Sequence, residues 1–397
     1  MCRVLVIATY DSFLRSGIKV AERISNLDNI EISILSVKKN QLSHRQLLES
    51  NAIKYKHIEF NDTLKLELYD IIVLSIGNAA TREFIKNFYK RFSDVLEKRP
   101  IIISLFPGVI FGHTDSILSR IDADIILANS VLDKEKAEEL IKIYHSNARI
   151  INYGLINIDA DKENIYSKRK SEKNIVFIEQ VRIPETKEEK ELVIDNLINL
   201  AQTYPDKNII FKRRIANNEK TVHDDKTSYI DIINKKKLPV NFFVSNEPID
   251  SLYEKMDLCL SFSSTVLLEA LYYGIPVAII SDFGVIEKYA LDKFLGSDLL
   301  ISFNDIAKGI RPISNHMWLK QNLSFNKERD TQLLELINTT RQSPKRIDNI
   351  NCLFGGGFRF NSSTKNYKKL RKFFRSPRAF FRDSKLKYFL GKLYYGK

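Results

Sequence analysis

The chain has 397 residues, of which 44% are hydrophobic and 28% are charged, a balance that is typical of globular proteins and excludes a disordered chain. The net charge of +13 gathers at the end of the chain: residues 365–397 contain twelve Lys or Arg and one acid, which leaves +2 for all the rest. A nearly neutral body argues against nucleic-acid binding. We see no signal peptide and no apolar stretch near the roughly 20 residues of a membrane span, so we expect a cytoplasmic protein.

The first part of the chain alternates buried strands with helices. Short apolar runs predict strands at residues 3–9, 30–37, 71–76, 101–105 and 125–128. Helical patterns occupy residues 11–25, 81–97 and 133–144. This alternation is typical of a doubly wound parallel sheet, and it predicts a first α/β domain over residues 1–158.

A polar, Lys-rich stretch over residues 159–173 marks the predicted domain boundary, after which the pattern starts again. Strands are predicted at residues 174–178, 208–212, 240–244, 258–262 and 276–280, with helices at 187–203, 249–255 and 266–273. Residues 285–345 look mainly helical. Residues 174–345 therefore form a second α/β domain. Two such domains leave a cleft at the carboxyl ends of their strands, where open α/β sheets bind ligands.

The strongest candidate site is the turn Ser263-Ser264-Thr265, which joins a predicted strand to a predicted helix. Free backbone N–H groups at a helix start favour an anion, and three hydroxyls add donors. Glu269, on the same helix, is a candidate for the ribose of a nucleotide. The alternative is an ordinary hydroxyl N-cap without a ligand.

A second candidate set follows the predicted strand 208–212. Lys212 and Arg214 point the same way by strand alternation and are candidates to neutralise a diphosphate. His223, on the loop that follows, is a candidate general acid for the leaving phosphate. The alternatives are a solvated basic loop and a surface histidine.

Other strand ends supply the remaining candidates. Asp11 follows the first strand and is a candidate general base toward an acceptor hydroxyl, or else a helix N-cap. Pro107 and Gly108 follow the fourth strand and are expected on the acceptor side of the cleft. Gln180 has the corresponding position after the first strand of the second domain, on the donor side.

The sequence offers no metal site that we would expect to act in catalysis. Asp122-Ala123-Asp124 has the spacing of a metal-binding pair of acids, but it precedes a strand, so we interpret it as a turn. Cations and helix dipoles must then stabilise the leaving phosphate. We expect neither a metal nor a cofactor.

The basic segment 365–397 interleaves cations with paired phenylalanines. We predict that residues 346–397 form a basic amphipathic helical tail, which suits an anionic membrane surface. The alternative is an ordinary amphipathic helix packed on the body.

Several of these stretches together resemble bacterial GT-B glycosyltransferases of capsule and lipopolysaccharide biosynthesis loci. They are Asp11-Ser12, Phe106-Pro107-Gly108, Gln180 with Pro184, Lys212-Arg213-Arg214 with His223, and the block from Ser263-Ser264-Thr265 to Asp282-Phe283-Gly284-Val285. The resemblance spans roughly residues 3–300 and extends distantly to sialyltransferases and Kdo transferases, which pair the Ser-Ser/Thr turn with a His-Pro motif. Lys212-Arg213-Arg214 stands in the corresponding place here.

The resemblance implies two Rossmann-like domains that face a cleft, the GT-B arrangement. It also implies a metal-independent transfer of sugar from a CMP-, UDP- or GDP-sugar to a glycan or lipid-linked acceptor, at the inner face of the bacterial inner membrane. Two rival functions remain open: a nucleotide-sugar epimerase on the same scaffold, and a non-catalytic scaffold of a polysaccharide assembly complex.

Overall fold

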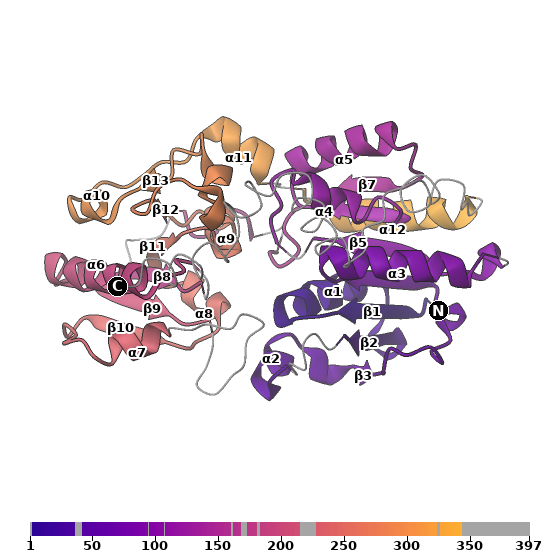
Figure 1. The fold of residues 1–397 in the computed structure, drawn as a ribbon, viewed down its shortest axis with the longest axis horizontal. Coiled ribbons are helices and arrows are strands. Elements are labelled where there is room, and N and C mark those ends of the chain that lie inside the picture. The colour runs from indigo at the N-terminus through magenta and orange to yellow at the C-terminus, as the bar shows by residue number, and fades with distance from the viewer. Residues whose placement is uncertain are drawn as a thin grey trace, which may run out of the picture. The chain divides into compact units, whose positions relative to one another are not determined.

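The structure is a computed structural model, and it describes residues 2–35, 42–93, 95–106, 108–159, 162–167, 173–180, 183–214, 228–323 and 326–343. Two parallel sheets dominate it, each with its own buried core (Figure 1). The prediction of two parallel α/β domains is therefore confirmed. The predicted basic tail lies outside the described residues.

The first sheet has the strand order β3-β2-β1-β4-β5-β6-β7 and is parallel throughout. Its central strands are buried on both faces, which explains their continuous apolar sequences. The strands are β1 (Val4–Ala8), β2 (Ile30–Ile34), β3 (Lys56–His57), β4 (Ile71–Ser75), β5 (Ile101–Leu105), β6 (Ile125–Ala128) and β7 (Arg149–Asn152). The helices of this part are α1 (Asp11–Ile24), α2 (His44–Glu49), α3 (Asn78–Arg91), α4 (Thr114–Leu118) and α5 (Val131–Ile143).

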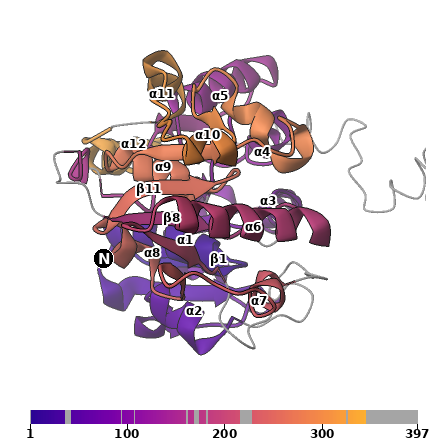
Figure 2. The ribbon, with the colours of Figure 1, turned by 90° about the vertical axis from the view of Figure 1, so that its left-hand side faces the viewer.

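The second sheet has the order β10-β9-β8-β11-β12-β13 and is also parallel. In Figure 2 the molecule is turned so that this sheet faces the viewer, with α6 beside β8. The strands are β8 (Asn174–Ile178), β9 (Asn208–Lys212), β10 (Phe242–Ser245), β11 (Met256–Ser261), β12 (Val277–Ile280) and β13 (Leu300–Ile301). The helices are α6 (Lys187–Thr203), α7 (Tyr229–Ile233), α8 (Ile249–Tyr253), α9 (Thr265–Tyr272), α10 (Phe303–Ala307), α11 (His316–Asn322) and α12 (Arg329–Gln342).

Both sheets reverse their winding direction at the same relative position. In the first sheet the reversal lies between β1 and β4, and in the second it lies between β8 and β11. Such a switch point opens a crevice at the carboxyl ends of the two strands, where ligands bind. Gly17 of α1 lies against Val6 of β1, and a Cβ at position 17 would lie only 2.7 Å from Val6 Cγ1. A glycine therefore lets α1 lie directly on β1.

Helix α12 follows the second sheet in the chain but packs against the core of the first (Figure 1). Leu333 and Ile337 are buried in that core, and the Arg329 guanidinium donates to the carbonyls of Leu155 and Ile158 at 2.9 and 2.7 Å. The predicted second domain of residues 174–345 includes this helix. By its contacts α12 belongs with the first core, because its apolar face completes the surface beside β5 and β7.

Candidate functional site

A cavity of about 240 Å³ is lined by residues from both sheets' domains. One wall comes from the loop after β5 and the start of α4, and the other comes from the start of α9 and the segment around residue 293. The lining residues are Val109, Ile110, Phe111, His113, Ser116, Ser263, Ser264, Thr265, Leu268, Ala290, Lys293 and Phe294. Residues with hydroxyl, imidazole and ammonium side chains therefore share the lining of this cavity with apolar residues.

The turn Ser263-Ser264-Thr265 lies at the switch point of the second sheet and starts α9. Ser264 is the N-cap, and its hydroxyl accepts the N–H of Val266 at 3.3 Å. The predicted N-cap is therefore present. All three residues of the turn also line the cavity, so the helix start that Ser264 caps lies at the cavity wall.

Gln180 holds this turn in place. Its Oε1 accepts the backbone N–H of Ser263 at 2.8 Å and the hydroxyl of Ser261 at 3.3 Å, while its Nε2 donates to Ser263 Oγ at 3.3 Å. Gln180 does not line the cavity. Its side chain therefore orients the Ser263 hydroxyl and fixes the loop between β11 and α9.

The loop after β5 faces this turn directly. A Cβ on Gly108 would lie 3.5 Å from Thr265 Oγ1, so the predicted acceptor loop and the predicted donor turn do meet. Asn129 holds the loop by donating its Nδ2 to the carbonyls of Phe106 and Gly108 at 3.1 and 2.7 Å. Pro107 lies outside the described residues.

A buried carboxylate also supports this loop. Asp133, at the start of α5, accepts the N–H of Gly112 at 2.6 Å. Burial raises the pKa of Asp133 to about 6, against the opposing effects of this hydrogen bond, those from Ser130 and Asn129, and the charge of Lys293. Lys293 also lines the cavity, and its positive charge acts on the carboxyl group of Asp133.

The predicted cations after β9 do not line this cavity. Lys212 Nζ donates to the carbonyl of Arg213 at 2.5 Å, and burial lowers its pKa despite the nearby charge of Glu49. Arg214 has an exposed side chain, and its backbone N–H donates to Glu179. His223 lies outside the described residues. Lys293 and His113 are the basic side chains that line the cavity beside the turn.

Glu269 and Asp11 also lie away from this cavity. The Glu269 carboxylate accepts the hydroxyl of Tyr253, and burial raises the Glu269 pKa, partly opposed by that hydrogen bond. Asp11 is the first residue of α1, and Tyr10 is the N-cap. The alternative interpretation of Asp11 as the N-cap is therefore wrong.

A second cavity of about 580 Å³ lies on the Glu269 side, between α1 and α8. Arg15, Lys19, Asp250 and Tyr253 are among its lining residues. Burial lowers the pKa of Lys19 to about 8, and its ammonium donates to the carbonyl of Asn157 at 2.5 Å. Many charged residues line this cavity, and Arg15 and Asp250 among them form an ion pair.

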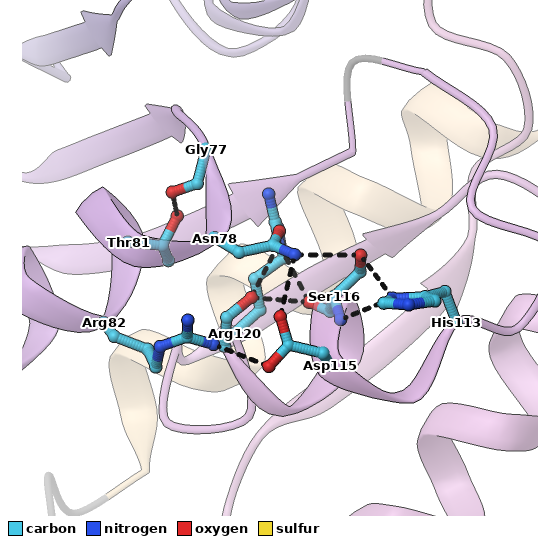
Figure 3. A network of polar contacts seen from close by, with 9 residues as sticks. Gly77, Asn78, Thr81, Arg82, His113, Asp115, Ser116 and Arg120 are labelled. Carbon is cyan, nitrogen blue, oxygen red and sulfur yellow. Dashed lines mark hydrogen bonds and ion pairs between the residues drawn. The ribbon is translucent and has the colours of Figure 1, made fainter. Parts of the chain in front are cut away.

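A polar network surrounds His113 at the start of α4 (Figure 3). His113 is the N-cap of this helix, and its side chain accepts the N–H of Ser116. Asn78, Asp115, Ser116 and Arg120 are joined to it by hydrogen bonds. His113 and Asp115 follow the predicted acceptor loop in the sequence, but no pattern gave them or the other residues of this network a role. No pattern in the sequence pointed to Lys293.

In the parts of the chain that the structure describes, no three His, Cys, Asp or Glu side chains gather as a metal site would need. Over the same residues, no helix has the length and apolar character needed to span a membrane.

Comparison with solved structures shows the fold. The *S. aureus* MnaA-UDP co-structure matches with a TM-score of 0.56 at 14% identity, over 87% of this chain and 98% of that one. The *Methanocaldococcus jannaschii* UDP-GlcNAc 2-epimerase in complex with UDP-GlcNAc and UDP matches with a TM-score of 0.52 at 12% identity, over 85% and 100%. No curated protein matches by sequence.

The sequence also matches one family model over most of its length. Residues 4–339 match the family described as "Putative glycosyltransferase (DUF6716)", a span that contains both sheets, both cavities and nearly all of α12. The chain therefore belongs to this glycosyltransferase family and has a GT-B-like fold of two parallel α/β domains.

Proposed function

We propose that this protein transfers a sugar from a nucleoside diphosphate donor to a surface-polysaccharide or lipooligosaccharide acceptor, without a metal ion. One observation carries the proposal: the hydroxyl-rich start of α9 shares a cavity with Lys293 and His113. Backbone N–H groups, hydroxyls and an ammonium group are the partners that a phosphate needs. The UDP bound in both structural neighbours supports a uridine nucleotide as the first donor to test.

The proposed roles follow from the cavity wall on which each residue lies. Ser263 and Thr265 hold the phosphates, and Lys293 neutralises the charge that develops on the leaving group. The acceptor approaches along Gly108 and the loop after it. In this proposal Lys293 has the role that we expected for Lys212 or Arg214. Roles for those two residues, for Glu269 at the ribose, and for Asp11 and His223 in proton transfer stay predictions.

A donor-cleavage assay tests this proposal. UDP-, GDP- and CMP-sugars are incubated with the protein, and release of free nucleotide is measured. We expect Lys293→Ala to lower kcat by about 10²–10³, the usual effect of removing one transition-state donor. Lys320→Ala, an exposed lysine on α11, is the matched control and should retain wild-type turnover. Equal turnover in both variants would remove Lys293 from the phosphate site.

An epimerase is the second candidate, because a UDP-GlcNAc 2-epimerase shares this fold. The same assay separates the two activities if the sugar is analysed as well as the nucleotide. An epimerase inverts one stereocentre of the sugar and needs no acceptor. Transfer to an added acceptor, with the sugar otherwise unchanged, supports the transferase. If no donor is bound or altered, a non-catalytic scaffold becomes the better explanation.

We further propose that the protein works at the inner face of the bacterial inner membrane, docked by residues 365–397. The net charge of +11 in this segment supports the proposal, since each cation near an anionic surface adds about 1 kcal/mol. Truncation after Asn351 should abolish sedimentation with anionic vesicles and spare donor cleavage in solution. Vesicle binding that survives the truncation would contradict it.

A further inference from the structure

The network around His113 starts from a buried cation. Arg120 is 2% exposed and donates to backbone carbonyls through all three nitrogens: Nε to Leu105, Nη1 to Ser116 and Nη2 to Ile76, at 2.8–3.0 Å. Burial lowers its pKa to about 9, so it remains a cation at neutral pH. A guanidinium has donors only. Every atom to which Arg120 donates must therefore be an acceptor.

This requirement fixes the orientation of the Asn78 amide. Arg120 Nη1 lies 2.9 Å from an atom of the Asn78 side chain, which must be the oxygen Oδ1. The amide nitrogen Nδ2 then points to Ser116 Oγ at 3.1 Å and to Asp115 Oδ2 at 3.3 Å, and it donates to both (Figure 3). Arg82 holds the other oxygen of Asp115 at 3.0 Å. The reversed amide would place two donors face to face.

The Ser116 hydroxyl carries the same constraint to His113. Its oxygen accepts from Asn78 and still carries one proton to donate, and His113 Nδ1 lies 3.2 Å away. The backbone N–H of Ser116 also points to Nδ1, at 3.4 Å. Two donors directed at one ring nitrogen require that nitrogen to be unprotonated. The proton of a neutral imidazole then sits on Nε2, across the ring from the network.

We infer that Arg120, Asn78 and Ser116 act as positioning residues that present His113 to the cavity as a neutral imidazole with its proton on Nε2. His113 is then a hydrogen-bond donor to a phosphate oxygen of the nucleotide-sugar, opposite the Ser263–Thr265 turn. This role rests on the proposed function. The tautomer itself does not, because it follows from the hydrogen bonds of His113 in the free protein. His113 therefore stabilises the leaving group and does not remove a proton from the acceptor.

The charged groups near His113 leave this order of donors intact. Asp115 and Arg82 form an ion pair with each other. Lys293 belongs to the other group of lining residues, and its charge acts on Asp133. Among the described residues, no hydrogen bond joins a carboxylate to His113, and both hydrogen bonds of its ring go to Ser116. The hydroxyl of Ser116 and its backbone N–H decide the tautomer.

Nitrogen NMR of the full-length, histidine-labelled protein tests the tautomer, with His113→Gln used to assign the signal. We expect a protonated Nε2 and an unprotonated Nδ1 in the wild type. In Asn78→Asp the new carboxylate can only accept, so it takes the Ser116 proton, and Nδ1 should gain proton occupancy. Asp115→Asn keeps an oxygen for Asn78 and is the control, with the wild-type pattern expected. A protonated Nδ1 in the wild type, or no change in folded Asn78→Asp, would overturn the inference.

Turnover of the nucleotide-sugar donor tests the role of His113. Glutamine keeps an N–H donor at this position, whereas glutamate offers only acceptors at neutral pH. We expect His113→Gln to stay within about tenfold of wild type and His113→Glu to lose about 10²–10³ in kcat. A glutamate variant as active as the glutamine variant would show that His113 is a base. If the wild type cleaves no donor, the proposed function fails while the NMR result still decides the tautomer.

Discussion

Arg15 of α1 forms an ion pair with Asp250 of α8, with 2.6 Å between Nη2 and Oδ2. Helix α1 lies on the first sheet, while α8 leads into the strand β11 of the second. The pair therefore joins the two α/β domains beside the second cavity. The Asp250 side chain is 60% exposed, so water and salt screen the attraction.

We predict that this ion pair adds little to the stability of the protein. Exposed pairs contribute about 0–1 kcal/mol, so the coupling free energy between Arg15→Ala and Asp250→Ala should fall in that range. A double-mutant cycle of urea unfolding measures it. Arg45→Ala with Glu49→Ala, an ion pair within α2, is a comparison cycle that joins no two domains. A coupling of several kcal/mol for the first cycle would mean that the contact is desolvated in solution.

The close approach of Gly108 to Thr265 predicts a size limit at position 108. An alanine Cβ would meet Thr265 Oγ1 at 3.5 Å, an ordinary contact, so Gly108→Ala should bind donor as the wild type does. Gly108→Phe would fill the space between the loop and the turn and should raise the KM for donor by at least about tenfold, or about 1.4 kcal/mol. Circular dichroism controls for the fold. A phenylalanine variant with an unchanged KM would show that donor does not enter here.

Asp122 predicts a pH dependence of stability. Burial raises its pKa from 3.8 to about 7, so the folded protein binds this proton more tightly than the unfolded chain does. The free energy of unfolding therefore falls as the pH rises toward 7 and is level above that value. Asp133 titrates near 6, so the decline between about 6 and 7 belongs to Asp122. Asp122→Asn should abolish that decline and be more stable above pH 7, by about a few kcal/mol.

Asp124 is the matched comparison two residues away. It pairs with Arg99 through two contacts of 2.7 Å and accepts the N–H of Ile102. Removing the carboxylate from a buried guanidinium costs about 3–5 kcal/mol. We therefore expect Asp124→Asn to destabilise the fold across the pH range. Urea unfolding from pH 5 to pH 8 measures both variants, and a stabilised Asp124→Asn would contradict the assignment of this acid to a structural ion pair.

Helix α12 offers a test of its attachment to the first core. Leu333 is fully buried there, and Leu→Ala at such sites costs about 2–5 kcal/mol. Leu334, its neighbour on the same helix, is 41% exposed, so Leu334→Ala should change stability by no more than about 0.5 kcal/mol. Thermal and urea unfolding compare the two. Equal effects would show that α12 is not packed on the sheet in solution.

Much of the fold could be predicted from the sequence, because parallel strands buried on both faces are continuous apolar runs. Three strands were not predicted. Two of them, Lys56–His57 and Leu300–Ile301, have only two residues, and Arg149–Asn152 begins with a charge and ends with an amide. Short edge strands owe their conformation to the neighbouring strand, so their own residues carry little signal.

The candidate site was predictable in part, for a similar reason. Ser263, Ser264, Thr265 and Gly108 follow the carboxyl ends of strands in the two sheets, the end at which open α/β sheets bind ligands. Lys293 lies in a short 3-10 helix whose position depends on tertiary packing, and no local pattern reveals it. Arg120 and Asn78 are 42 residues apart in sequence, and only the fold shows that one dictates the orientation of the other.

The attachment of α12 bears on the order in which the chain folds during synthesis. Among the described residues, the core of the second sheet contains no buried residue after Leu323, whereas the core of the first includes Leu333 and Ile337. Domains that emerge first from the ribosome usually fold first. In this protein the core of the first sheet also needs α12, which is synthesised after the second sheet. We therefore expect the first domain to complete its fold only after residues 329–342 have left the ribosome.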